Sequence, residues 1–324
     1  MSGDEPGLDR APLIATPAAP IPGGAEASWV RGANGARLRA ARFAPAGGAR
    51  GSVVLSGGRT EPIEKYLEVI EELCARGFAV LAHDWRGQGL SHRALLDRLR
   101  GHATGTDELV HDLFALVDRH QARLPRPWIA LGHSMGGCLT LLALASGLVE
   151  RFSAAALVAP MLRVRTAPVP HALAVLLARA ACLAGRADRY VLGRRTSPLD
   201  EPFEGNPLTH DRARWDRHQA QLAACPDLAL GGPTWGWLDT ALRATALLAR
   251  PERLRRVTIP VLVCAAGEDR VVDSAAARAA ARQLPDGRFV LVRGARHEIL
   301  METDERRAVF WRAFDEVAAE VAPP

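Results

Sequence analysis

The stretch Ala-Leu-Gly-His-Ser-Met-Gly-Gly, residues 130–137, decides the fold of this chain. It contains the pentapeptide Gly-His-Ser-Met-Gly, in which Ser134 stands between Gly132 and Gly136. A short apolar run at 128–131 precedes it, and a longer run of apolar and small residues at 138–148 follows it. This pattern predicts a strand, a tight corner and a helix, with the serine hydroxyl raised above the end of a sheet. The glycines fit such a corner because a side chain at either position would collide with the neighbouring strand or helix.

Strand-like and helix-like segments alternate on both sides of this corner. Asn34-Gly35 indicates a hairpin between the first two strands. An opening hairpin followed by strand–helix units predicts an α/β fold, with a doubly wound, mostly parallel sheet of eight strands and an antiparallel edge. The pattern predicts strands at 29–31, 37–43, 51–55, 78–82, 128–131, 154–159, 257–265 and 288–292, and helices at 62–76, 106–120, 135–148, 274–284 and 304–321.

The alternation stops between residues 162 and 256, where the chain is helical and punctuated by prolines. We interpret this segment as a helical insertion over the carboxyl ends of the strands, where open α/β sheets bind ligands. The first 28 residues are rich in proline, glycine and alanine. The predicted organisation is therefore a flexible N-terminal arm (1–28), a core made of 29–161 and 257–324, and a lid-like insertion (162–256).

Composition excludes several classes of protein. The chain has 324 residues, of which 48% are hydrophobic, so it can bury a full core. The formal charge of +5 comes almost wholly from arginines interleaved with acids. That pattern is typical of a solvated surface, with docking on an anionic membrane as the lesser alternative. No nucleic-acid-binding module is present in the sequence.

The cysteines and the apolar runs bear on the compartment. The five cysteines are widely spaced and form no Cys-x-x-Cys pair, which favours a reducing compartment over a disulfide framework or a zinc site. The sequence shows no signal-peptide pattern and no uninterrupted apolar window long enough to span a bilayer. We expect a cytoplasmic protein, with peripheral membrane contact as an option. The sequence carries no prediction of oligomeric state.

Ser134 needs partners before it can act as a nucleophile. A serine hydroxyl reacts poorly near neutral pH, so it requires a base, and the base requires an orienting acid. In this topology the order along the chain is serine, acid, histidine. Asp269 and His297 each lie one short loop beyond a late strand, on the same rim as the serine. We predict a catalytic triad of Ser134, Asp269 and His297, with Glu268 as the rival acid. No metal motif is present, and the chemistry requires no cofactor.

Acyl transfer also requires donors for the developing oxyanion. One is expected to be the backbone amide of Met135, directly after the nucleophile. The other is expected from Ser-Gly-Gly-Arg-Thr (56–60), the loop after the third strand. Arg59 is the favoured donor and Gly58 the alternative. Among the other histidines, His133 is expected to point away from the site, whereas His83 and His102 are candidates for the pocket wall, with a structural role favoured for each.

Six segments together resemble one family. They are Ser-Gly-Gly-Arg-Thr-Glu-Pro-Ile-Glu-Lys-Tyr (56–66), Asp-Trp-Arg-Gly-Gln-Gly-Leu-Ser (84–91), Gly-His-Ser-Met-Gly-Gly (132–137), Asn-Pro-Leu-Thr (206–209), Gly-Gly-Pro-Thr-Trp-Gly-Trp (231–237) and Gly-Ala-Arg-His-Glu-Ile-Leu-Met-Glu (294–302). The chain resembles the α/β-hydrolase superfamily, and within it the bacterial lysophospholipase and monoacylglycerol lipase-like group. One departure stands out: many lipases of the superfamily have His-Gly where this chain has Ser56-Gly57.

The resemblance implies that Ser134, Asp269 and His297 form the triad and that the insertion is a lid controlling access of an acyl chain. The insertion carries an apolar helix around Leu176 and three tryptophans. Large apolar residues here suit a single-chain lipid better than a charged peptide. The residues expected to line the pocket are Trp215, Trp235, Trp237 and Leu176. The alternative is that these residues pack the lid against the core.

These observations lead to a functional hypothesis with two alternatives. The chain is expected to be a serine hydrolase that cleaves carboxylic esters of lysophospholipids or monoacylglycerols through an acyl-enzyme. The first alternative is a serine aminopeptidase, a general carboxylesterase or a thioesterase of the same fold. A peptidase would need a pocket acid to bind the substrate amine, and Glu204 and Asp239 are the candidates. The second is a non-catalytic binding protein, which a complete triad disfavours.

Overall fold

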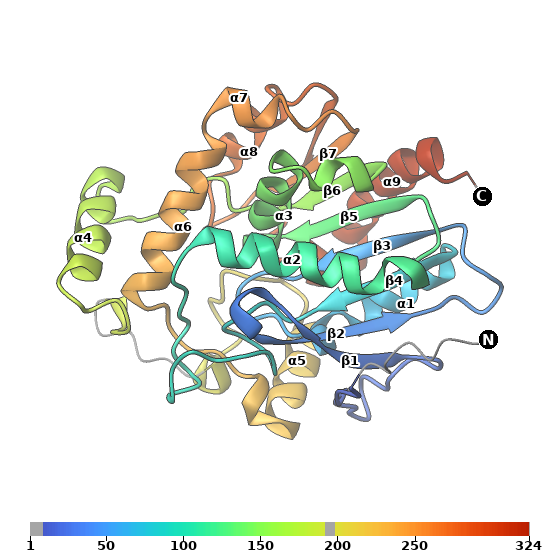
Figure 1. Cartoon of the computed structure of the whole chain (residues 1–324), viewed down its shortest axis with the longest axis horizontal. Coiled ribbons are helices and arrows are strands. Elements are labelled where there is room, and N and C mark those ends of the chain that lie inside the picture. Colours follow the sequence, from blue (N-terminus) through green and yellow to red (C-terminus); the bar gives the residue numbers. More distant parts are fainter. Residues whose placement is uncertain (1–8, 192–197, 324) are drawn as a thin grey trace.

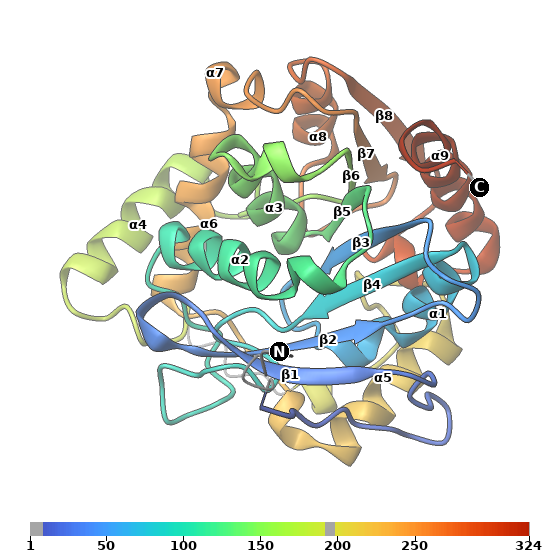
Figure 2. The ribbon, with the colours of Figure 1, turned by 45° about the vertical axis from the view of Figure 1, so that its right-hand side comes forward.

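The computed structural model describes residues 9–191 and 198–323. The described residues form one eight-stranded sheet in the order β1-β2-β4-β3-β5-β6-β7-β8 (Figures 1 and 2). Only β2 runs against its neighbours in this part of the chain, and the other pairs from β4 onward are parallel. The prediction of a doubly wound, mostly parallel sheet is confirmed. The strands are β1 (Glu26–Arg31), β2 (Arg37–Phe43), β3 (Gly51–Ser56), β4 (Phe78–His83), β5 (Trp128–His133), β6 (Ala154–Val158), β7 (Val261–Ala266) and β8 (Gly287–Val292).

Helices cover both faces of the sheet. The core on one face contains residues of α2, α3 and α8, and the core on the other contains residues of α1 and α9 (Figure 1). Five adjacent strands, β3 to β7, are buried at every position because helices cover them on both sides. The helices are α1 (Leu67–Ala75), α2 (Thr106–His120), α3 (Met135–Ala145), α4 (His171–Leu183), α5 (Arg212–Ala224), α6 (Trp235–Leu248), α7 (Pro251–Leu254), α8 (Ser274–Ala281) and α9 (Asp304–Val321).

The strand order reverses next to the serine. After β3 the chain moves to one side to form β4, and then crosses to the other side of β3 to form β5 (Figure 2). The carboxyl ends of β3 and β5 are therefore neighbours, with Ser56 paired to Gly132. Loops that leave adjacent strands in opposite directions open a crevice at this point. The loop after β3 and the corner at Ser134 form its two walls.

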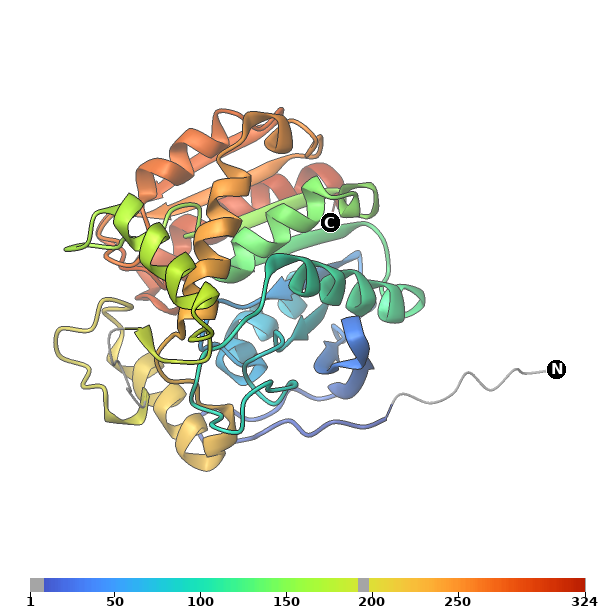
Figure 3. The same cartoon turned by 60° about the vertical axis from the view of Figure 1, so that its left-hand side comes forward.

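The insertion between β6 and β7 has two parts. Helix α6 belongs to the core, since Ala241, Ala244 and Leu248 are buried in the same cluster as α2 and α3. Helix α4 packs on the outer side of α6, and α5 lies toward the β1–β2 side of the molecule (Figure 3). Helix α6 is therefore part of the helical layer of the core, although it lies within the insertion expected at 162–256.

The N-terminal arm differs from expectation from residue 9 onward. The amide of Trp29 donates to the carbonyl of Asp9 (2.8 Å), and Arg39 donates to the carbonyl of Pro12 (3.1 Å). The amide of Ile14 donates to the buried carboxylate of Glu64 (3.1 Å). These bonds tie residues 9–14 to the core, so the arm is not flexible over its whole length as expected. The first eight residues lie outside the described part. Among the described residues, no helix is both long and apolar enough to cross a bilayer.

Candidate active site

Ser134 occupies a tight corner between β5 and α3. Its backbone has φ 50° and ψ −116°, a conformation that residues other than glycine rarely adopt. The turn forces close contacts: a Cβ on Gly136 would overlap the carbonyl oxygens of Ser56 and Gly57. A Cβ on Gly132 would lie 2.7 Å from the Cα of Gly137. The expected steric need for both flanking glycines is therefore met, and the side chain of Ser134 stands at the carboxyl end of the sheet.

A chain of two hydrogen bonds links Ser134 to an acid. The Oγ of Ser134 is 2.8 Å from Nε2 of His297, and Nδ1 of His297 is 2.8 Å from Oδ2 of Asp269. All three residues are buried. Because a carboxylate only accepts, Nδ1 carries the proton and Nε2 is left to accept from the serine hydroxyl. This is the geometry that a general base requires.

Asp269, the acid of the triad, is also held by hydrogen bonds from backbone amides. Oδ1 of Asp269 accepts from the amides of Val271 (2.8 Å) and Val272 (2.9 Å). Burial acts to raise the pKa of Asp269, but the hydrogen bonds from His297 and these amides outweigh it, so the pKa lies below its ordinary value. The rival acid Glu268 instead lies at the surface, where its carboxylate is 3.8 Å from Nε2 of His210. The structure thus pairs His297 with Asp269.

Two backbone amides near the serine have no acceptor among the described residues. Met135 supplies the first amide of α3, and Arg59 supplies an amide from the loop after β3. The amide of Gly58, by contrast, already donates to the carboxylate of Glu61. Unused donors at a helix start and in an adjoining loop suit a developing negative charge. The structure leaves Met135 and Arg59 available for that role and engages Gly58 elsewhere.

A cavity of about 500 Å³ opens over Ser134 and His297. Trp215 and Trp237 line it, as expected. Trp235 does not line it, and Leu176 points outward from α4 with 64% of its surface exposed. The apolar part of the lining comes from the ends of β6 and β7 and from the insertion, and includes Met161, Val164, Leu230, Val271 and Val272.

In the described part of the chain three acids line the cavity, Glu61, Glu201 and Glu298, and neither of the two expected acids is among them. Glu204 is exposed and lies 3.4 Å from Arg212, and Asp239 lies near Arg243 (3.5 Å) on α6. Neither lines the cavity, whereas Glu201 does. Burial raises the pKa of Glu201, against the opposing charge of Arg59. The guanidinium of Arg59 is itself buried against Trp237, and burial lowers its pKa to about 10. The acid and the cation both line the cavity, and their opposite charges act on one another.

The three other histidines considered from the sequence, His133, His83 and His102, each have a hydrogen-bond partner. His133 does not point away from the site: it lines the cavity, and its Nε2 is 3.2 Å from the carbonyl oxygen of His297. His83 pairs with Ser56 (2.9 Å) and His102 with Thr234 (3.0 Å). Neither of these two lines the cavity, which fits the structural role favoured for them.

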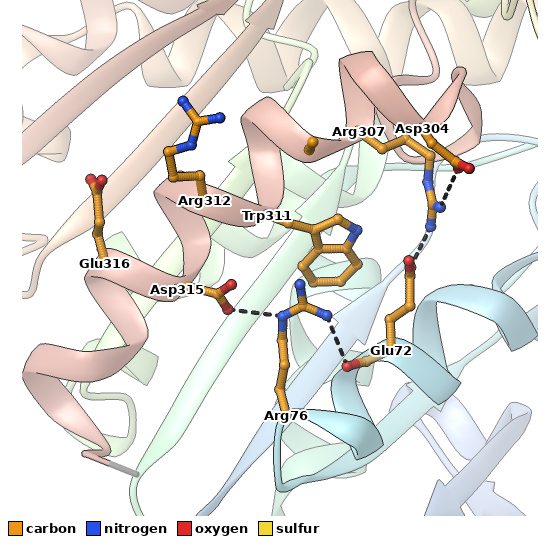
Figure 4. Close-up of a pocket in the computed structure, with 9 residues that line it drawn as sticks. Glu72, Arg76, Asp304, Arg307, Trp311, Arg312, Asp315 and Glu316 are labelled. Carbon is orange, nitrogen blue, oxygen red and sulfur yellow. Dashed lines mark hydrogen bonds and ion pairs between the residues drawn. The ribbon is translucent and has the colours of Figure 1, made fainter.

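A second hollow, of about 690 Å³, lies between α1 and α9 and contains no triad residue (Figure 4). Charged pairs occupy its walls. Arg307 binds Glu72 and Asp304, and Arg76 binds Asp315 while its guanidinium stacks 4.1 Å from the Trp311 ring (Figure 4). These charged side chains pair with one another, so they form an ion-pair network that joins α1 to α9. We therefore do not assign a reaction site to this hollow.

With this geometry established, comparison with known proteins identifies the family. The family model described as "Serine aminopeptidase, S33" matches residues 47–304. The chain belongs to this family, within the α/β-hydrolase superfamily. It is 35% identical to lysophospholipase L2 of Escherichia coli (strain K12) over 271 residues, which cover 79% of this chain and 77% of that protein. It is 27% identical to the monoglyceride lipase of Rattus norvegicus, with 84% of each covered.

Solved structures agree with the fold. The crystal structure of a soluble variant of the monoglyceride lipase from Saccharomyces cerevisiae, in complex with a substrate analogue, superimposes with a TM-score of 0.74. That alignment covers 94% of this chain and 99% of the other, at 21% identity. A thermostable carboxyl esterase from Bacillus coagulans, in complex with glycerol, gives a TM-score of 0.69 at 18% identity, with 90% of this chain and 99% of the other covered. The α/β-hydrolase fold expected from the sequence is confirmed.

Proposed function

We propose that this protein is a serine hydrolase that cleaves the carboxylic ester of a single-chain lipid, a lysophospholipid or a monoacylglycerol. The observation that carries the proposal is the pair of 2.8 Å contacts that join Ser134, His297 and Asp269 beneath the cavity. The relatives named lysophospholipase L2 and monoglyceride lipase support the ester and lipid assignment.

The reaction follows from the positions of these groups. His297 Nε2 accepts the proton of Ser134 Oγ as the oxygen attacks the ester carbonyl, and Asp269 stabilises the imidazolium that forms. The amides of Met135 and Arg59 hold the oxyanion. His297 then returns the proton to the leaving alcohol, which leaves an acyl-enzyme on Ser134. A water molecule, deprotonated by His297, attacks the acyl group and releases the fatty acid.

The cavity supports a lipid rather than a peptide. Its volume of about 500 Å³ falls in the range of small-ligand sites. An aminopeptidase would need a free acid for the substrate amine. Of the three described acids that line the cavity, Glu61 and Glu298 are bound by Lys65, and the charge of Glu201 is opposed by the nearby cation of Arg59. The ester hydrolysis is therefore favoured over amine recognition. We assign the segment between β6 and α6 as the lid over this cavity.

We further propose that α4 contacts a lipid surface. The helix faces α6 with the small residues Ala174 and Ala178 and turns its leucines outward, the reverse of an ordinary surface helix. Arg179 is the one fully charged side chain on α4, and its guanidinium lies 3.8 Å from the carboxylate of Asp239 on α6. An outward apolar face of this kind suits a lipid–water interface. The five cysteines are all unpaired, which supports a cytoplasmic placement.

Release of fatty acid tests the function. The substrates are lysophosphatidylcholine, monoacylglycerol and a short p-nitrophenyl ester, with the Ser134→Ala variant as control. We expect long-chain turnover that the variant loses. Turnover of the short ester alone would remove the lipid assignment and keep the triad. Full activity of the Ser134→Ala variant would exclude the acyl-enzyme mechanism at Ser134.

A further inference from the structure

A second histidine lies against His297. His133 is the last residue of β5, it is 3% exposed, and its ring centroid is 5.0 Å from that of His297. Its Nδ1 is 2.8 Å from Oε2 of Glu61, and its Nε2 is 3.2 Å from the backbone oxygen of His297. One imidazole ring thus joins the strand that leads to Ser134, the loop after β3 and the loop after β8.

Both neighbours of this ring are acceptors. A backbone carbonyl has no proton to give, so Nε2 of His133 must donate to it. Glu61 likewise has no proton to give. Its carboxylate also accepts from the hydroxyl of Tyr66, the amide of Gly58 and the ammonium of Lys65 (3.2 Å). An acid surrounded by donors is ionised and accepts from Nδ1 as well. The two bonds are satisfied together only if both ring nitrogens of His133 carry protons.

The buried charges around this ring balance. Lys65 bridges Glu61 and Glu298, with its Nζ 2.5 Å from Oε1 of Glu298. Glu61 contacts the ring from the loop after β3, with Tyr66 and Lys65 bound to it, and His297 and Glu298 act on the ring from the loop after β8. His218 of α5 interacts with Lys65 and Glu61, but burial lowers its pKa to about 3, so it is neutral and adds no charge. Burial lowers the pKa of His133, but the charge and hydrogen bond of Glu61 outweigh it and leave the pKa raised. A positively charged His133 and Lys65 are thus offset by two carboxylates.

We propose that His133 is a positioning residue, protonated at neutral pH, that fixes the main chain of His297 relative to Ser134. The inference rests on the proposed ester hydrolysis. Two contacts hold the loop at His297 and Glu298: His133 donates to the backbone carbonyl of His297, and Lys65 donates to the side chain of Glu298. The amide of Glu298 also donates to the carbonyl of Leu208 (2.8 Å). The general base is held from the β5 side by His133 and from the insertion by Leu208.

The kinetic test is His133→Asn. Loss of the tie allows the His297 loop to shift, and a misplacement of about 1 Å costs about 100-fold in rate. We expect kcat to fall about 10- to 100-fold with KM changed less than about twofold. The wild type should also lose kcat at alkaline pH, as His133 gives up its proton, and the variant should lack that limb. His120→Asn is the matched control, because His120 is a buried histidine on α2 that does not line the cavity.

The direct test is the protonation of the ring itself. In ¹⁵N-labelled wild-type protein, we expect both ring nitrogens of His133 to carry protons at pH 7.5, in signals that the His133→Asn protein lacks. A ring with one bare nitrogen would overturn the proposal. So would a His133→Asn protein with wild-type kcat, or one whose kcat loss is matched by His120→Asn. If the wild type hydrolyses no ester, the positioning role falls with the proposed function, while the spectrum still decides the charge of His133.

Discussion

His297 and Ser134 are 163 residues apart in the chain, yet Nε2 of one lies 2.8 Å from Oγ of the other. The contact depends on the parallel sheet, since β5 and β8 end on the same edge. Ser134 follows β5 directly, and His297 follows β8 after a short loop. The insertion lies between them in sequence and covers them in space. The core therefore positions both base and nucleophile, and the insertion adds a tie to the loop of the base through the carbonyl of Leu208.

Asp269→Asn should nearly abolish turnover. The amide cannot hold His297 Nδ1–H as a carboxylate does, so the imidazole adopts the wrong tautomer, and kcat should fall by about 10³- to 10⁴-fold. Burst kinetics with a p-nitrophenyl ester will measure the acylation rate. Glu268→Gln is the matched control and should keep wild-type kcat, because Glu268 is exposed. Equal losses in the two variants would reassign the acid.

The triad was predictable because its signals are local. Each member follows a strand by no more than a few residues, and parallel strands carry such positions to one edge of the sheet. The tie from His133 to Glu61 was not predictable, because these residues are 72 positions apart and the direction of the His133 ring depends on the turn at Ser134. The only sequence signal for it was the unusual run of ionisable residues in the otherwise buried loop after β3.

Gly136→Ala should damage the oxyanion site. The added methyl group would overlap the carbonyl oxygens of Ser56 and Gly57, so the loop that carries Arg59 must move. We expect kcat/KM to fall at least about 100-fold, together with a lower melting temperature. Gly47→Ala is the control, since nothing lies within 4 Å of its added Cβ. Wild-type kinetics in Gly136→Ala would show that the loop is not held as described.

Leu176→Asp should weaken action at lipid surfaces while sparing the site. Leu176 lies on the outer face of α4 and outside the cavity. A charge there opposes insertion into an interface, so hydrolysis in anionic vesicles should fall at least about fivefold, with the short soluble ester hydrolysed normally. Leu96→Asp is the matched control, because Leu96 is an exposed leucine on a loop distant in sequence from α4. A vesicle loss in both variants, or in neither, would exclude α4 as the contact.

The insertion was the least predictable part of the fold. Periodicity indicated helices there but not which faces are covered, because α4 is apolar on nearly every side. Leu176 was thus expected in the cavity, although the small residues Ala174 and Ala178 are the ones that allow close packing on α6. The pocket acid Glu201 was missed for a related reason: it lies outside the helices of the insertion, where periodicity does not indicate which side chains face the cavity.

Glu68→Gln should destabilise the protein at neutral pH more than in acid. Glu68 on α1 binds Arg214 of α5 (2.6 Å) and also binds Arg217. Burial acts to raise the pKa of Glu68, but these arginines prevail and lower it to about 2. A lowered folded pKa means that the stabilisation is complete above about pH 5 and is lost as the pH falls toward 2. Urea unfolding at pH 7 should show that the free energy of unfolding falls by about 1–2 kcal/mol, allowing for partial exposure, and by less at pH 3.5.

Glu71→Gln is the control, because Glu71 lies on the exposed side of α1, and it should change the free energy of unfolding at neither pH. A loss in Glu68→Gln that does not depend on pH would contradict the charge-based explanation.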